Sequence, residues 1–206
     1  MRSQALGIAR GQASRRGLPD REAGGMKVVF KPLESLPPSF APLLLHWRNS
    51  EPVRGQMLRQ SVVSDEEHIV WYRKVISAGS SYRVRVVFAD EEPFGAIYLT
   101  DIDPDSSNAS WGMYIGEECF RGRGLARPMM AALLLWGFEE LSLFRMYTSV
   151  LEGNERAMSL YCQAGFRTEG VWRKHVVTSE GRRDLLWIGM LHEEWETVRE
   201  QVGEWS

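Results

Sequence analysis

The spacing of apolar and polar positions predicts a chain of short strands and amphipathic helices. Runs rich in β-branched and aromatic residues, which favour strands, lie at 26–34, 82–90, 94–103, 109–118 and 144–152, with two more inside 165–191. Runs with helical spacing lie at 37–50, 64–77, 125–142, 155–165 and 192–201. Three strand runs follow one another before helices and strands alternate, so we expect one layered domain of the α+β or α/β class.

The first 25 residues lack this periodicity. They are rich in Gly, Ala, Ser and Arg, and they contain no continuous apolar stretch of the kind found in a secretory signal. We therefore expect residues 1–25 to be a disordered tail or the product of a start site placed too early. Residues 26–200 are expected to form the domain.

The composition excludes several functional classes. The 206 residues are 44% hydrophobic and 25% charged, which suits a globular domain that buries its core without disulfides. A net charge of −2 provides no basic field for nucleic acid, and no apolar run approaches the roughly 20 residues that cross a bilayer. Cys119 and Cys162 lie far apart without metal-binding spacing, which is typical of reduced thiols in a cytoplasmic protein. We expect a small-molecule ligand, with no metal, nucleic acid or membrane.

A loop that combines glycine and arginine precedes the longest predicted helix. The stretch CFRGRGLARPMM spans residues 119–130 and follows a strand run, so the amides of residues 122–126 converge at a helix N-terminus. Unpaired N–H groups and the helix dipole at such an end favour a phosphate, and glycine lets the backbone approach it. A glycine-rich turn with solvated arginines is the alternative that this stretch alone leaves open.

A second pattern lies on the helix predicted at 155–165. Asn154 and Tyr161 are seven residues apart, which is two helical turns, so they share a face and one ligand could contact both. Gly165 and Phe166 then end the helix and return the chain to the sheet. Without the loop, the same residues fit a structural interpretation, with Asn154 as a helix cap and Tyr161 as packing.

Taken together, the two patterns resemble the GCN5-related N-acetyltransferase (GNAT) family. The first motif reads Arg121, Gly122, Arg123, Gly124, Leu125 and Ala126, and the second reads Asn154, Ala157, Tyr161, Gly165 and Phe166. The resemblance implies an α+β fold, in which helices flank a mixed, mostly antiparallel central sheet and splayed central strands form a wedge for acetyl-CoA. It places the pyrophosphate of acetyl-CoA on residues 121–126 and the pantetheine arm beside Tyr114, Ile115 and Gly116, with Asn154 and Tyr161 also in contact.

The same resemblance points to direct attack of a neutral amine on the thioester. It makes Tyr161 the candidate general acid for the leaving thiolate, because a tyrosine hydroxyl stays protonated at neutral pH. The backbone N–H of Tyr114 or Ile115 would stabilise the oxyanion. The base stays open, because Ser110 stands where many relatives have a glutamate. His68, Asp101 and a water relayed to a backbone carbonyl are the alternatives.

The acceptor side is expected in residues 43–72, where aromatic, basic and amide groups gather. Trp47 could stack on a base or sugar, Arg48 or Arg54 could pair with phosphate, and the candidate acceptor residues are Trp47, Arg48, Asn49 and His68. The Trp-Arg-Asn run looks like the branch that acetylates a UDP-linked 4-amino sugar in pseudaminic acid biosynthesis. Alternatives are a protein N-terminus in the manner of ribosomal-protein acetyltransferases, another small amine, and a coenzyme A-binding sensor without turnover. A homodimer is compatible with this picture.

Overall fold

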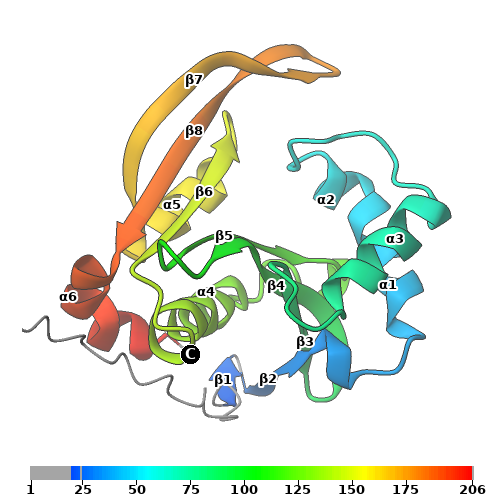
Figure 1. The fold of residues 1–206 in the computed structure, drawn as a ribbon, viewed down its shortest axis with the longest axis horizontal. Coiled ribbons are helices and arrows are strands. Elements are labelled where there is room, and N and C mark those ends of the chain that lie inside the picture. The colour runs from blue at the N-terminus through cyan, green and yellow to red at the C-terminus, as the bar shows by residue number, and fades with distance from the viewer. Residues whose placement is uncertain (1–19, 24, 206) are drawn as a thin grey trace, which may run out of the picture.

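The computed structural model describes residues 20–23 and 25–205, and it is built on one eight-stranded sheet (Figure 1). The strand order is β1-β2-β3-β4-β5-β6-β8-β7, and every neighbouring pair is antiparallel except β5 and β6. The strands are β1 (Arg21–Ala23), β2 (Met26–Pro32), β3 (Arg83–Ala89), β4 (Glu92–Asp103), β5 (Asn108–Ile115), β6 (Arg145–Leu151), β7 (Arg167–Thr178) and β8 (Gly181–Leu191). The predicted α+β class with a mostly antiparallel sheet is confirmed.

The helices agree with the predicted order, except that α2 was not predicted and one helix is divided. They are α1 (Phe40–Asn49), α2 (Glu51–Arg54), α3 (Asp65–Val75), α4 (Ala126–Leu134), α5 (Glu155–Gln163) and α6 (His192–Gly203), with short turns η1 (Leu33–Ser35) and η2 (Glu118–Phe120). The helix predicted at 125–142 is confirmed from Ala126, but after Leu134 the α-helix α4 passes directly into a wider π-helical segment, η3 (Leu135–Glu140). Gly137 lies in that segment against the sulfur of Met146 on β6, where a Cβ would come within 2.2 Å of it.

The N-terminal boundary also differs from the prediction. Residues 1–19 lie outside the described part of the chain, but Arg21–Ala23 form strand β1 and pair with β2. Ala23 is buried, and the Arg21 guanidinium donates to the carbonyls of Gly203, the last residue of α6, and Trp205, just beyond it. The tail predicted to end at residue 25 is therefore wrong over these three residues, whose run is too short to show a strand pattern in the sequence.

Two apolar layers cover the two faces of the sheet. On one face, α4, η3 and α6 contribute to a core that includes Phe94, Trp111 and Phe166. On the other face, α1 and α3 pack over β3 and β4 through a second core around Leu44 and Trp47. The capping box predicted at the start of α3 is confirmed, because Ser64 Oγ accepts from the Glu67 amide and the Glu67 carboxylate accepts from the Ser64 amide.

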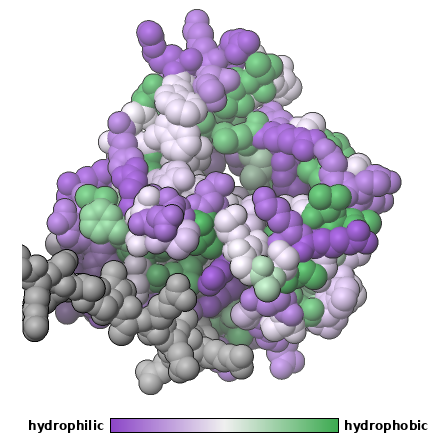
Figure 2. Space-filling model, viewed as in Figure 1, coloured by the Kyte–Doolittle hydropathy of each residue, from purple (hydrophilic) through white to green (hydrophobic). Residues whose placement is uncertain are grey.

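The strands β7 and β8 form a long hairpin that arches over the end of β6 in Figure 1. Figure 2 shows hydrophilic side chains gathered at the tip of this hairpin, and the turn residues Ser179 and Glu180 are exposed. Within the described part of the chain, every helix falls short of the length and apolar character needed to cross a membrane.

Candidate active site

The site begins where β5 and β6 separate. Their parallel pairing covers three residues, from Asn108 with Arg145 to Ser110 with Tyr147. Beyond this point β5 stays with β4 and β6 stays with β8, so the two strands diverge as Figure 1 shows. The backbone groups on the facing edges of a separated pair have no ladder partners, so they are available to a ligand that lies between the strands.

A cavity of about 520 Å³ occupies this wedge. Residues 110–115 of β5 and 148–151 of β6 form its walls, and Asn154 and Tyr161 of α5 lie along one side. Arg121 and Ala126, at the two ends of the predicted phosphate loop, line it as well, and α2 with residues 56–58 closes the opposite side. The structure therefore brings the loop, the β5 edge and α5 together around one space.

The phosphate loop has the geometry expected of an anion cradle. Gly122 and Gly124 have φ values of +76° and +80°, a conformation that glycine adopts without strain. A Cβ at either position would meet no atom within 4 Å, so backbone conformation and not packing accounts for both glycines. Among the described residues, the amides of residues 122–125 have no hydrogen-bond partner, and α4 begins directly after them. These free donors at a helix N-terminus fit a pyrophosphate.

The three arginines around this loop have different surroundings. The Arg121 guanidinium donates to the carbonyl oxygens of Ile115 (3.3 Å) and Gly116 (2.9 Å), so it ties the loop to the end of β5. Arg123 is exposed beside the ring of Phe120, and Arg127 donates to Gln163 on α5. Of the two arginines predicted to contact the cofactor, Arg121 and Arg123, only the side chain of Arg123 makes no hydrogen bond or ion pair with another described residue.

The β5 edge supplies backbone groups in an alternating order. The Gly116 amide donates to the Phe94 carbonyl of β4 at 2.8 Å. Backbone groups alternate between the two sides of a strand, so the Tyr114 N–H also faces β4, while those of Met113 and Ile115 face the wedge. Ile115 therefore fits the predicted role towards acetyl-CoA, and the amides of Tyr114 and Gly116 do not. Met113 is an additional donor, which strand alternation in the sequence could have indicated.

Tyr161 is held by aromatic packing on the α5 side of the wedge. Its ring meets Trp111 edge-on at 4.8 Å between centroids, and it also contacts Phe166. Burial raises the pKa of the Tyr161 hydroxyl, and the nearby Tyr98 raises it further. The hydroxyl is therefore protonated across the neutral range and can donate a hydrogen bond. Asn154 caps the N-terminus of α5, where its side-chain oxygen accepts from the Ala157 amide at 3.3 Å, and its side chain also lines the cavity.

The candidate bases are placed unequally. Ser110 lines the wedge cavity, whereas Asp101 is exposed on an irregular part of β4 and His68 lies outside that cavity. His68 is buried, and its Nε2 donates to the Ala41 carbonyl at 2.7 Å. Burial lowers the pKa of His68, so its ring is neutral at pH 7. Among the described residues that line the wedge cavity, none is a carboxylate or a histidine.

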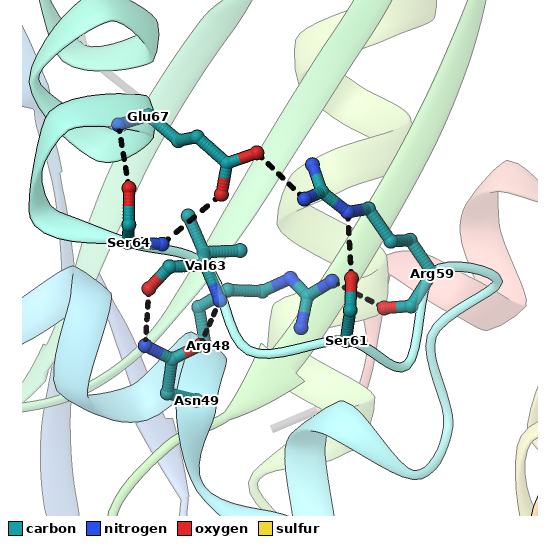
Figure 3. Close-up of polar contacts among 7 residues, drawn as sticks. All are labelled: Arg48, Asn49, Arg59, Ser61, Val63, Ser64 and Glu67. Atoms are coloured by element: carbon teal, nitrogen blue, oxygen red, sulfur yellow. Dashed lines mark hydrogen bonds and ion pairs between the residues drawn. The ribbon is translucent and has the colours of Figure 1, made fainter.

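Two of the predicted acceptor residues are structural. Trp47 is 1% exposed, and its indole N–H donates to Glu117 Oε1 at 2.6 Å. The indole lies so close to Gly116 that a Cβ there would come within 2.2 Å of it. The side chain of Asn49 donates to the Val63 carbonyl and accepts from the Val63 amide (Figure 3). The prediction that Trp47 stacks on a substrate is wrong, and Asn49 has a structural partner for both ends of its amide.

Arg48 and His68 instead line a second cavity of about 320 Å³ beside the wedge. This acceptor-side cavity lies between α1, α3 and the sheet, and it shares Met57, Tyr98 and Tyr114 with the wedge cavity. Aromatic rings in contact with one another form a wall along it, from His68 through Trp71, Tyr82 and Tyr98 to Tyr114, against which the buried Trp47 packs. The sequence pattern did not indicate Tyr82 or Tyr98, because both read as ordinary strand residues.

Comparison with known families decides what this arrangement is. Residues 30–167 match the acetyltransferase (GNAT) domain. The chain belongs to this family. YdaF of Bacillus subtilis (strain 168), provisionally named a ribosomal N-acetyltransferase, is 28% identical over 150 residues, which cover 70% of this chain and 75% of that protein. Spermidine N(1)-acetyltransferase of Escherichia coli (strain K12) is 33% identical over 90 residues, which cover 44% and 48% of the two chains.

Solved structures support the same fold. The spermidine N-acetyltransferase of Vibrio cholerae in complex with CoA and spermine superposes with a TM-score of 0.75 at 20% identity, covering 82% of this chain and 98% of that chain. The GNAT domain and these relatives make the chain an acetyl-CoA-dependent N-acetyltransferase. None of the three names points to a nucleotide-sugar acceptor.

Proposed function

We propose that the chain transfers an acetyl group from acetyl-CoA to the primary amine of a small molecule by direct attack on the thioester. The observation that carries this proposal is the wedge between β5 and β6, because it joins the phosphate loop, the free β5 amides and Tyr161 around one cavity. Acetyl-CoA is the cosubstrate, and residues 122–126 with Met113 and Ile115 are the groups that would hold it.

Tyr161 would donate a hydrogen bond to the departing sulfur. Since burial raises the pKa of its hydroxyl, Tyr161 is a weaker acid than an ordinary thiol, whose pKa is about 8.5. Full transfer of the tyrosine proton to the thiolate is therefore unfavourable, and we assign Tyr161 to stabilising that charge. The N–H groups of Met113 or Ile115 are the candidates for the oxyanion, because they face the wedge.

The amine would lose its proton without a dedicated acidic or imidazole side chain. The wedge lining offers hydroxyls, including Ser110 and Thr100, and the Met113 carbonyl faces the same side as its amide. A water held between such groups can carry the proton to solvent. The amine would then enter neutral or lose its proton as it binds, so Asp101 and His68 are not assigned to this step.

A small amine is supported over a UDP-linked sugar. Two of the relatives are named for spermidine, and the buried Trp47 removes the stacking partner on which the nucleotide-sugar hypothesis depended. Transfer to a protein N-terminus and a homodimeric assembly both stay predictions.

Release of coenzyme A thiol by the full chain tests this function. The acceptor panel would contain spermidine, glucosamine, glucosamine 6-phosphate, a UDP-linked 4-amino sugar, and alanine- and serine-terminated peptides. We expect acceptor-dependent thiol release with at least one small amine. Tight acetyl-CoA binding without thiol release from any acceptor would instead support a coenzyme A-binding sensor, and release with peptides alone would support the protein N-terminus.

A further inference from the structure

The acceptor-side cavity contains an arginine with an unused donor. Arg48, on α1, lines this cavity, and its Nη2 donates to the carbonyl oxygen of Arg59 at 2.6 Å. Its Nη1 is buried and has no hydrogen-bond partner among the described residues, and Figure 3 shows this nitrogen without a contact to the neighbours drawn. A buried charged donor left unpaired is costly, so such a group is a candidate for ligand binding.

The charges around Arg48 are unbalanced towards positive. Burial is the main cause that lowers the pKa of Arg48. Tyr98 and Tyr114 oppose this shift, whereas the nearby Arg59 and Arg54 add to it. Glu67 is the only carboxylate among the described residues that line either cavity, and it is already paired with Arg59 at 2.6 Å. Arg48 and Arg59 therefore line the acceptor-side cavity with one carboxylate, and an anion would offset the excess charge.

Arg48 is also held in a fixed position. Asn49, the next residue, clamps the backbone of Val63 from both sides, and the Arg54 guanidinium donates to the Gln60 carbonyl at 2.7 Å. These bonds fix the α2–α3 loop, residues 55–63, against the end of α1. The guanidinium of Arg48 is thus pre-oriented, which lowers the entropy cost of binding an anion.

We infer that Arg48 binds an anionic group of the acceptor, a phosphate or a carboxylate, while the acceptor amine enters the wedge. The inference rests on the proposed function, because Tyr98, Tyr114 and Met57 line both cavities and so connect the Arg48 subsite to the place of acetyl transfer. The aromatic wall between them suits a ring as the body of the acceptor. The subsite therefore predicts a preference for anionic amines over spermidine, which carries only positive charges, and the relatives named for spermidine support only the small size of the acceptor.

Matched acceptors test this subsite. Glucosamine 6-phosphate is compared with glucosamine for the phosphate arm, and 4-(aminomethyl)benzoate with benzylamine for the carboxylate arm. We expect Arg48→Gln to raise the KM of the anionic member of the preferred pair roughly tenfold to hundredfold, which is the loss of one charged hydrogen bond. The KM of the neutral member should change less than about twofold, because only the anion contacts Arg48.

Arg59→Gln is the control variant. Its guanidinium lines the same cavity but is already paired with Glu67 and Ser61, and the carbonyl that holds Arg48 remains in the variant. We expect Arg59→Gln to have the smaller effect on anionic acceptors. Arg48→Lys, which keeps the charge, should retain part of the preference, and the thermal midpoint of each variant reports any loss of folding.

A binding measurement separates failure of the subsite from failure of the function. Calorimetry with inorganic phosphate and with benzoate is performed on protein saturated with coenzyme A, so that the phosphate loop is occupied. Binding that Arg48→Gln abolishes supports the subsite even if no amine in the panel is acetylated, in which case the proposed function is wrong. Equal use of neutral and anionic amines, an equal rise of KM for both members of a pair, or anion binding unaffected by Arg48→Gln overturns the subsite and leaves the acetyl transfer in place.

Discussion

Replacing Tyr161 with phenylalanine isolates the hydroxyl from the ring. Phenylalanine keeps the edge-on contact with Trp111 and the contact with Phe166, so the aromatic cluster at the end of α5 is preserved. The free energy of unfolding should change by less than about 1 kcal/mol, since the Tyr161 hydroxyl makes no hydrogen bond to another described residue that the substitution would remove. Any large effect on turnover then belongs to the hydroxyl itself.

The size of that effect follows from the direction of the pKa shift. A general acid contributes about 10²- to 10⁴-fold, but Tyr161 is too weak an acid to protonate a thiolate fully. A hydrogen bond to a charged group contributes about 1.5–3 kcal/mol, which corresponds to roughly 10- to 150-fold in rate. We therefore expect Tyr161→Phe to lower kcat by about 30-fold, with acetyl-CoA affinity almost unchanged, because the bond forms as the sulfur becomes charged.

The assay is the initial rate of thiol release at saturating acetyl-CoA, measured from about pH 6 to pH 9. A group whose pKa is raised loses its proton only at higher pH, so the hydroxyl stays protonated throughout and the ratio of wild-type to variant kcat should stay constant. Activity of Tyr161→Phe within about twofold of wild type would remove Tyr161 from catalysis. A ratio that falls towards one as the pH rises to about 9 would show that Tyr161 ionises in this range, and this would contradict the raised pKa of its buried hydroxyl.

Three further predictions concern the loop and the helices. Gly124→Val should weaken acetyl-CoA binding in calorimetry more than Arg123→Ala does, because valine strains a backbone at φ +80° whereas Arg123 is exposed; the reverse order would contradict the amide cradle. Trp47→Phe should lower the free energy of unfolding, measured by urea denaturation, by about 2 kcal/mol, because the hydrogen bond to Glu117 is lost. A rise in acceptor KM without this loss of stability would instead show that Trp47 contacts the substrate. Burial lowers the pKa of His68, so its contribution to stability is present above its ordinary pKa of 6.5 and is lost as the pH falls below it. The thermal midpoint should therefore fall between about pH 7.5 and pH 5 by less in His68→Gln, and equal falls would disprove this role.

The cofactor half of the site could be predicted from the sequence because it depends on local features. Gly122 and Gly124 are set by the backbone conformation of one loop, and Asn154 and Tyr161 lie two turns apart on one helix. Each feature is contained in a short segment, so its spacing is visible in the chain. The sequence did not predict which β5 amides face the wedge. Their direction depends on the register between β5 and β4, which the hydrogen bond from the Gly116 amide to the Phe94 carbonyl fixes.

The acceptor half could not be predicted in the same way, because its contacts join distant segments. Trp47 finds its partner at Glu117, 70 residues away, and nothing in its neighbourhood along the chain distinguishes a buried indole from a stacking one. Strand β1 is three residues long and is held by Arg21 through two carbonyls at the C-terminal end of α6. In both cases the deciding interaction is a long-range hydrogen bond, and amphipathic periodicity carries no information about it.

The acceptor half and the cofactor half of the site are fixed by different kinds of contact, and this difference affects how acceptor specificity can change. Side chains from α1 and α2 fix the α2–α3 loop by bonding to its backbone, with Arg48 on the Arg59 carbonyl, Asn49 on Val63 and Arg54 on the Gln60 carbonyl. A carbonyl is present whatever side chain the loop residue carries. The loop can therefore change its own side chains, including those that line the acceptor-side cavity, without losing the bonds that position it. The phosphate loop has no such freedom, because its glycines are themselves the binding geometry. We therefore propose that acceptor specificity in this chain resides in residues 55–63 and in the charge of Arg48, on a cofactor-binding framework that does not need to change with them.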